Sequence, residues 1–184
     1  MGTGERKRRE REEREELMIS HAGRLLLRDG FQGLNLDELA RAIEYAKGTI
    51  YQHFCTKEDL VLAVATRALQ LRAELFERAA GFTGRTRERM RAVGVACCQF
   101  AVVHPKYFQL DLMLHSQSFW LEASPERRMA HGRMGERCFR VMDTIVQAAR
   151  EAGDLPSTPD ADAVKFSLVA VTMGSHAMAL EPEI

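Results

Sequence analysis

The sequence predicts an all-α protein, in which a small N-terminal head of three helices is joined by a long helix to a larger helical bundle. Apolar residues recur every three or four positions over nearly the whole chain, which is the spacing of one face of an α-helix. Alternating runs of β-branched and aromatic residues, which would indicate strands, are almost absent. Gly and Pro separate the helical stretches, so the elements can be placed in order.

Composition narrows the class of protein. The 184 residues fit a small domain fused to a larger one, and the balance of 46% apolar and 28% charged residues is that of a globular protein. The 26 basic residues equal the 26 acidic ones, so any surface for nucleic acid must be local. No apolar run approaches the roughly 18 residues of a membrane span, and the charged N-terminus lacks the apolar part of a secretory signal.

The four cysteines, at positions 55, 97, 98 and 138, form no C-x-x-C pair. This spacing does not indicate a disulfide framework. We therefore expect a reducing, cytoplasmic compartment and no membrane partner.

The first helix has a charged beginning and an apolar face that starts near Leu17 and ends at Asp29 and Gly30. A glycine at that position is a frequent helix C-cap. For the basic letters "ERKRRER" at its start two interpretations are open. They can enter a DNA minor groove, or they can form a solvated helical extension, which the following "EEREE" favours.

Two short helices come next. In "NLDELARAI", Asn35 can cap the helix, and the side chain of Glu38 can bond back to the backbone N–H of Asn35, as in a capping box. "KGTIYQHF" follows after about three residues, with Ile50 and Phe54 facing inward. Short helices are unstable alone, so both must pack on the first helix, and the sharp turn between them defines a helix-turn-helix.

A long helix begins after Thr56, a suitable N-cap, and runs to Gly81. It divides a head, residues 1–56, from a body, residues 57–184. In the body we expect a helix over 86–103, a break at His104 and Pro105, a segment up to about residue 119, a helix over 125–151 and a last helix from about residue 161.

The polar stretch 46–57 does not have the pattern of a catalytic site. Lys47, Gly48 and Thr49 are residue types found in a P-loop, but they stand in the wrong order and no strand precedes them. The chain contains no G-x-S-x-G, no H-E-x-x-H and no pair of E-x-x-H helices. We therefore expect no enzyme, no cofactor and no metal.

Recognition of an anionic polymer accounts better for the same residues. With Ile50 and Phe54 inward, Thr49, Gln52 and His53 point largely outward. Thr, Gln and Tyr can bond to base edges or phosphates, lysines can bind phosphates, and a glycine permits close approach. The alternative is an ordinary solvated helix face.

The stretch "LNLDELARAIEYAKGTIYQHFCTKEDLVLAVA" resembles the DNA-binding head of TetR/AcrR-type transcriptional regulators. The match runs without gaps from about Leu17 to Ala65, and it is densest over "KGTIYQHFCTKEDL". "AVVHPKYFQL" is a weaker match to the family's helix break after His-Pro.

The resemblance implies a homodimer whose two heads read a two-fold operator in successive major grooves of double-stranded DNA. Gln52 would read bases, and Tyr51, His53, Asn35 and Lys57 would hold phosphates. The residues expected at the DNA are Asn35, Lys47, Gly48, Thr49, Tyr51, Gln52, His53 and Lys57.

One position departs from the family pattern. Glu44 and Tyr45 stand in the turn where the family usually has a glycine and a small branched residue. If the turn requires positive φ, it strains a glutamate by roughly 1 kcal/mol.

In the family the body binds a small effector, and here Met and aromatic residues suit an apolar or aromatic molecule, although such residues at helical spacing also make an ordinary core. The candidates are Cys97, Phe100, His104, Phe108, Met113, His115, Phe119, Trp120, Met134, Phe139 and Met142. A metal sensor using the body's histidines has no supporting spacing, and a redox role for the paired cysteines is equally weakly supported.

The last helix carries small residues along one side, which suits a two-fold four-helix interface with the 125–151 helix. The candidates for this dimer interface are Ala163, Phe166, Ala170, Gly174 and Ala177. Many family members have another helix after the point where the sequence ends, at "EPEI".

We therefore predict a ligand-responsive DNA-binding transcriptional regulator. It is expected to be a repressor released from a palindromic operator by a small molecule, although the sequence does not separate repressor from activator. The alternative is a helical small-molecule binding or enzymatic module with a vestigial head, which Glu44 supports.

Overall fold

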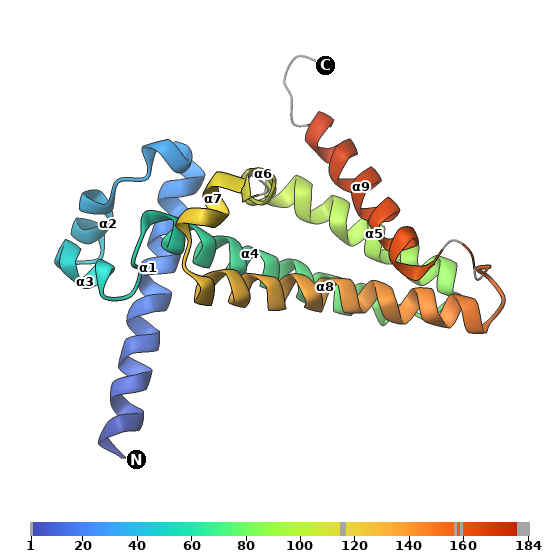
Figure 1. The fold of residues 1–184 in the computed structure, drawn as a ribbon, viewed down its shortest axis with the longest axis horizontal. Helices are drawn as coiled ribbons and strands as arrows, with labels where there is room; N and C mark the ends of the chain where they lie inside the picture. The colour runs from blue at the N-terminus through green and yellow to red at the C-terminus, as the bar shows by residue number, and fades with distance from the viewer. Residues whose placement is uncertain (1, 115–116, 157, 159, 180–184) are drawn as a thin grey trace. The chain divides into compact units, whose positions relative to one another are not determined.

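The structure is a computed structural model that describes residues 2–114, 117–156, 158 and 160–179. All regular elements in these ranges are helices, which confirms the predicted all-α class (Figure 1). In chain order they are α1 (Thr3–Gly33), α2 (Leu36–Ala42), α3 (Lys47–Tyr51), α4 (Lys57–Ala80), α5 (Thr86–Val103), α6 (Pro105–Leu114), α7 (Gln117–Glu122), α8 (Pro125–Glu151) and α9 (Ala161–Ala179).

The chain forms two compact units. The first contains the residues up to Thr66 together with Leu114–Met129, and the second contains Arg67–Met113 and the residues from Ala130 onward. The predicted domain boundary, after residue 56, falls within the first unit. The first unit therefore includes the beginnings of α4 and α8 as well as the helix-turn-helix.

In the first unit, α2 and α3 lie beside α1, whose N-terminal turns extend past them (Figure 1). Met18 and Ala22 of α1, Leu39 of α2 and Leu60 of α4 are fully buried in this unit. Gly30 has φ 71 and ψ −177, so the regular part of α1 ends there as predicted, because a residue without Cβ adopts positive φ without strain.

Asn35 caps α2 as expected, since its Oδ1 accepts from the N–H groups of Asp37 at 2.8 Å and Glu38 at 3.3 Å. The second half of the predicted capping box is wrong. The Glu38 carboxylate accepts instead from Nη2 of Arg28 at 2.7 Å. A guanidinium is a stronger, charge-assisted donor than the backbone N–H at the cap.

The N-cap of α4 is confirmed, because Oγ1 of Thr56 accepts from the N–H of Asp59 at 3.0 Å. Asp59 itself is only 2% exposed. Its carboxylate accepts from the N–H of Cys55 at 3.1 Å and from that of Ser124 at 2.7 Å. This one buried side chain thus joins the start of α4 to the residue before α8.

The second unit is built from the remainder of α4 and α8 with α5, α6 and α9. The predicted break is present at His104, between α5 and α6, where the following proline cannot donate to the helix ladder. The core consists of Leu69, Ala73, Phe76, Val93, Ala96, Cys97, Cys138, Val141, Met142 and Ile145. None of the described helices is both long and apolar enough to cross a membrane.

Candidate nucleic-acid interface and ligand cavity

Helix α3 is held to the head by Ile50 and Phe54, each 1% exposed. This inward pair leaves Lys47, Gly48, Tyr51 and Gln52 exposed at α3, while Thr49 is half-buried. A Cβ at Gly48 would meet no atom within 4 Å. The head itself therefore does not require glycine there, whereas close approach of another molecule would.

The expectation that His53 points outward is wrong, because its side chain is only 3% exposed. Helix α3 ends at Tyr51, and the N–H of His53 bonds to the carbonyl of Ile50 in a turn. Helical spacing therefore does not extend to residue 53. The ring Nδ1 lies 3.4 Å from Oε2 of Glu15 on α1.

Three side chains predicted to bind phosphate have partners within the head. Asn35 caps α2, as described above. Nζ of Lys47 bonds to Oδ2 of Asp37 at 2.9 Å, and this bond raises the pKa of the lysine. Nζ of Lys57 lies 4.6 Å from the centre of the Phe31 ring. A phosphate would have to compete with these contacts, and the DNA-contact assignments stay predictions.

Glu44 adopts φ 59, the positive value expected for this turn. The N–H of Glu44 bonds to the carbonyl of Arg41 at 3.3 Å, and that of Tyr45 bonds to the carbonyl of Ala40 at 3.0 Å. These two bonds form the Schellman motif, in which this position is usually glycine. The glutamate therefore occupies the left-handed conformation that the missing glycine would occupy without strain.

The charged extension of α1 is helical from Thr3 onward, as the second of the two interpretations expects. Its arginines pair along the helix with glutamates four residues later, at positions 6–10, 8–12 and 9–13. Nη2 of Arg11 donates to the carbonyl of Gln52 at 3.3 Å. The extension therefore contacts the end of the recognition segment, which comprises α3 and the two residues that follow it, Gln52 and His53.

Arg127, in the first turn of α8, was not anticipated from the sequence. Its Nη1 lies 2.8 Å from Oε1 of Glu15, and its Nη2 donates to the carbonyl of His53 at 3.2 Å. Its guanidinium also stacks 4.7 Å from the centre of the Phe54 ring. Burial raises the pKa of Glu15, but the bonds and charges of Arg127 and His53 outweigh it, so this pKa is lowered.

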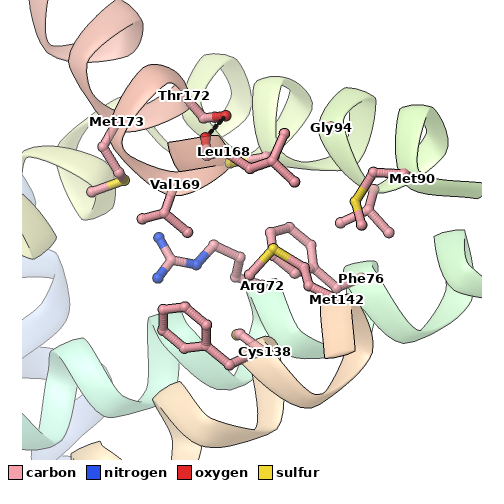
Figure 2. A pocket seen from close by; sticks show the side chains of 13 residues that line it. Arg72, Phe76, Met90, Gly94, Cys138, Met142, Leu168, Val169, Thr172 and Met173 are labelled. Atoms are coloured by element: carbon pink, nitrogen blue, oxygen red, sulfur yellow. Dashed lines mark hydrogen bonds between the residues drawn. The ribbon is translucent and has the colours of Figure 1, made fainter. Parts of the chain in front are cut away.

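The second unit contains a cavity of about 130 Å³ between α4, α5, α8 and α9 (Figure 2). Its walls are mainly apolar. The lining residues are Arg72, Phe76, Met90, Val93, Gly94, Cys97, Cys138, Phe139, Met142, Leu168, Val169, Thr172 and Met173.

Of the predicted effector residues, Cys97, Phe139 and Met142 line this cavity. The others do not line it. Phe100 and Phe108 are buried, His104 is at the helix break, and Met113 and Met134 are half-buried. Phe119 and Trp120 belong to the first unit, and His115 lies outside the described residues. Their roles stay predictions. Among the described residues, no group of three or more potential metal ligands gathers at one place.

The charged residue of the cavity, Arg72, was also not anticipated. It follows Leu69 by three residues and precedes Phe76 by four, so it shares the buried face of α4. Its Nη1 lies 2.8 Å from Oδ2 of Asp111, with both side chains less than a fifth exposed. Burial lowers the pKa of Arg72, but Asp111 outweighs this effect and raises it.

Helix α9 has two different faces. Its inner face provides Leu168, Val169, Thr172 and Met173 to the cavity, a contribution the sequence reasoning missed. The outer face carries the predicted dimer residues: Phe166, which is 62% exposed, Ala170 and Gly174 are exposed, and Ala163 and Ala177 are half-buried.

The N-terminal part of the chain matches a known family. Residues 19–64 match the family described as bacterial regulatory proteins, tetR family. This match contains all of α2 and α3 and the start of α4. A comparison with curated proteins gives no match.

Solved structures with similar folds extend the likeness to the body. A TetR/AcrR transcriptional regulator from Thermobifida fusca has a TM-score of 0.73 and 21% identity, with 94% of this chain and 88% of that chain covered. FadR from Bacillus subtilis, solved in complex with stearoyl-CoA, has a TM-score of 0.71 and 15% identity, with 88% and 84% covered. PfmR from Thermus thermophilus has a TM-score of 0.65 and 18% identity, with 91% and 87% covered.

The match over residues 19–64 and the fold of the described residues confirm the resemblance seen in the sequence. Residues 19–64 match the tetR family of bacterial regulatory proteins, and the described part of the chain has the fold of solved TetR/AcrR regulators.

Proposed function

We propose that the protein is a homodimeric repressor that binds a palindromic operator and is released when a small molecule enters the cavity of the second unit. The observation that carries this proposal is the exposed face of α3, with Tyr51 and Gln52, within a head of the TetR family. The apolar cavity in the same chain supports a ligand-controlled regulator over an enzyme. Such a protein acts in the cytoplasm, where the operator is.

Each head would place α3 in a major groove. Gln52 can present its amide to a base edge, because a glutamine can bond an adenine at two points. Tyr51 and Lys47 would bind phosphates, which position the head without reading sequence. In a two-fold dimer the two recognition helices must reach grooves about 34 Å apart.

Release would follow from movement of α4. This helix carries Asp59, which is bonded within the head, and Arg72, which lines the cavity. A ligand that displaces α4 would change the separation of the heads, so that they no longer match two successive grooves. Structures with and without ligand that show the same head separation would contradict this mechanism.

The outer surface of α9 would form the dimer interface together with α8. Phe166, Val171 and Met178 are 62%, 69% and 60% exposed on this helix. Exposed large apolar residues are typical of a surface that another chain covers. The small residues Ala170 and Gly174 would allow the two copies to approach closely.

Selection of binding sequences from random duplex DNA, followed by gel-shift titration at several salt concentrations, tests the DNA-binding proposal. Tyr51→Ala and Lys57→Ala should weaken binding to all operator variants, because phosphate contacts carry no sequence information. Gln52→Ala should relax the preference at particular base pairs. Equal losses at every operator variant for all three substitutions would contradict this division of roles.

Absence of sequence-specific, salt-sensitive binding by the wild-type protein would favour the second candidate. In that case the chain is a helical small-molecule binding or enzymatic module with a vestigial head. The strained Glu44 in the turn before α3 is the observation that supports this alternative.

A further inference from the structure

We infer that the cavity of the second unit takes a small uncharged molecule, about the size of one ring system, that presents a hydrogen-bond acceptor to Arg72. This inference rests on the proposed role of the cavity as the effector site, and it adds the chemical class of the ligand. It is argued from the size of the cavity, the partners of Arg72 and the balance of charge.

The size of the cavity limits the ligand. Its volume is about 130 Å³, slightly below the roughly 150 Å³ of an engineered protein cavity that binds benzene. Most pockets for drug-sized molecules have about 300–1,000 Å³. A ligand of roughly six to ten non-hydrogen atoms fits this space without rearrangement of the walls.

Gly94 provides part of the space on the α5 side. It lines the cavity, and a Cβ built on it would meet no atom within 4 Å. A larger side chain at this position would therefore project without a clash and fill volume that the ligand otherwise uses. This makes Gly94 a suitable place to close the cavity by substitution.

Two polar groups of the cavity other than Arg72, the Thr172 hydroxyl and the Cys138 thiol, already have partners. The hydroxyl of Thr172 donates to the carbonyl of Leu168 at 2.7 Å (Figure 2). The thiol of Cys138 faces the carbonyl of Leu69 at 3.9 Å. A ligand therefore meets apolar side chains over most of its surface, and its polar atom must bind elsewhere.

Arg72 offers the missing partner. Figure 2 shows its guanidinium extending from α4 toward Val169 and Met173 of α9, on the far side of the cavity. One of its five N–H groups bonds to Asp111, which does not line the cavity. The Cys138 sulfur is also near this guanidinium, but a thiol sulfur is only a weak acceptor of its N–H groups. Among the described residues no further acceptor bonds to this guanidinium. The remaining N–H groups of Arg72 are open to the cavity and not sealed within the protein, so a ligand oxygen placed there accepts a charge-assisted bond that the protein does not supply.

The charges around the cavity favour an uncharged ligand. Arg72 and Asp111 neutralise one another, and no other lining side chain is an acid or a base of their strength. Burial raises the pKa of the Cys97 and Cys138 thiols, which keeps them protonated. A carboxylate would add an unbalanced charge in a buried site, which costs free energy. A ketone, ester or ether oxygen accepts from Arg72 without this cost.

Three probes of similar size separate the alternatives: acetophenone has a neutral acceptor, ethylbenzene has none, and benzoate is an anion. Binding to the purified full-length protein is measured by isothermal titration calorimetry. Acetophenone should bind about ten-fold more tightly than ethylbenzene, which is the effect of one net hydrogen bond, and benzoate should bind most weakly. Equal binding of the first two, tighter binding of benzoate, or no binding of any probe would overturn the inference.

Substitutions locate the effect. The double variant Arg72→Met with Asp111→Leu removes both charges together, so no buried charge is left unpaired, and it should bind acetophenone and ethylbenzene equally. Asp111→Asn should instead improve benzoate at least ten-fold, because Arg72 then lacks its counter-ion. Gly94→Leu should abolish binding of acetophenone. A ten-fold preference for acetophenone that persists in the double variant would show that Arg72 is not the anchor.

Gel-shift titration of the same proteins separates this inference from the proposed function. Specific DNA binding without the acetophenone preference overturns the inference and leaves the regulator intact. The acetophenone preference without DNA binding supports the ligand class and overturns the repressor.

Discussion

Arg127 and Glu15 form an ion pair with 2.8 Å between Nη1 and Oε1, which joins the first turn of α8 to α1 within the first unit. The same guanidinium donates to the carbonyl of His53, the residue that follows the exposed part of the recognition segment. The end of this segment is thus held from two helices that are distant in sequence. The orientation of α3 depends on α8 as well as on the helix-turn-helix.

Arg127→Ala should reduce the free energy of unfolding by about 1–3 kcal/mol, because it removes charge-assisted bonds and leaves Glu15 partly buried without its partner. Urea unfolding followed by circular dichroism measures the change. Arg133→Ala, at an exposed position of the same helix, should change stability by less than about 0.5 kcal/mol. Equal effects of the two substitutions would contradict a specific role of Arg127.

The contribution of Glu15 should depend on pH. Its pKa in the folded protein is lowered from the ordinary value of 4.5, so its stabilising effect is present above 4.5 and lost as the pH falls through the folded value. The stability difference between the wild type and Glu15→Gln should therefore be constant from pH 7 to pH 5 and shrink below pH 4.5. Unfolding curves at pH 7, 5, 4 and 3 measure it. Glu10→Gln, in an exposed pair, is the control and should have little effect at any of these values.

Glu44→Gly should stabilise the protein by about 0.5–1 kcal/mol, since glycine adopts the positive φ of this turn without the strain of a side chain. Thermal unfolding measures the change. Arg41→Gly, in the last turn of α2, is the matched control and should destabilise by up to about 1 kcal/mol. A loss of stability in Glu44→Gly would show that the carboxylate makes a contribution larger than the strain.

Phe166→Glu should convert the proposed dimer into monomers, because the substitution places a charge at an exposed position of the proposed interface on α9. Sedimentation velocity over a range of protein concentrations measures the assembly. Val102→Glu is the control, since Val102 is 79% exposed on α5 and outside that interface. A dimer that survives Phe166→Glu and is disrupted by Val102→Glu would move the interface to α5.

Local chemistry predicted several features well. Asn35, Thr56 and Gly30 act on the backbone within a few residues, and the structure places the caps and the break where those residue types favour them. Positive φ at position 44 was expected from the family pattern of the turn. These features need no knowledge of the rest of the fold.

The features that escaped prediction depend on residues distant in sequence. Glu38 bonds to Arg28 in place of the cap, and His53 is buried against Glu15 because α3 ends after five residues. Helical spacing alone could not show that Glu38 bonds to Arg28 or that His53 lies against Glu15. The burial of Arg72 could have been predicted, because it lies on the same face of α4 as Leu69 and Phe76.

The two faces of α9 have a further consequence. The inner face lines the cavity and the outer face is the proposed contact with a second copy, so one helix of 19 residues would take part in both proposed equilibria. If the ligand binds the dimer and the monomer with different affinities, ligand binding and self-association each shift the other. The sensitivity of such a regulator to its ligand then varies with the number of its own copies in the cell, and transcription of its own gene becomes a means of setting the dose at which it responds.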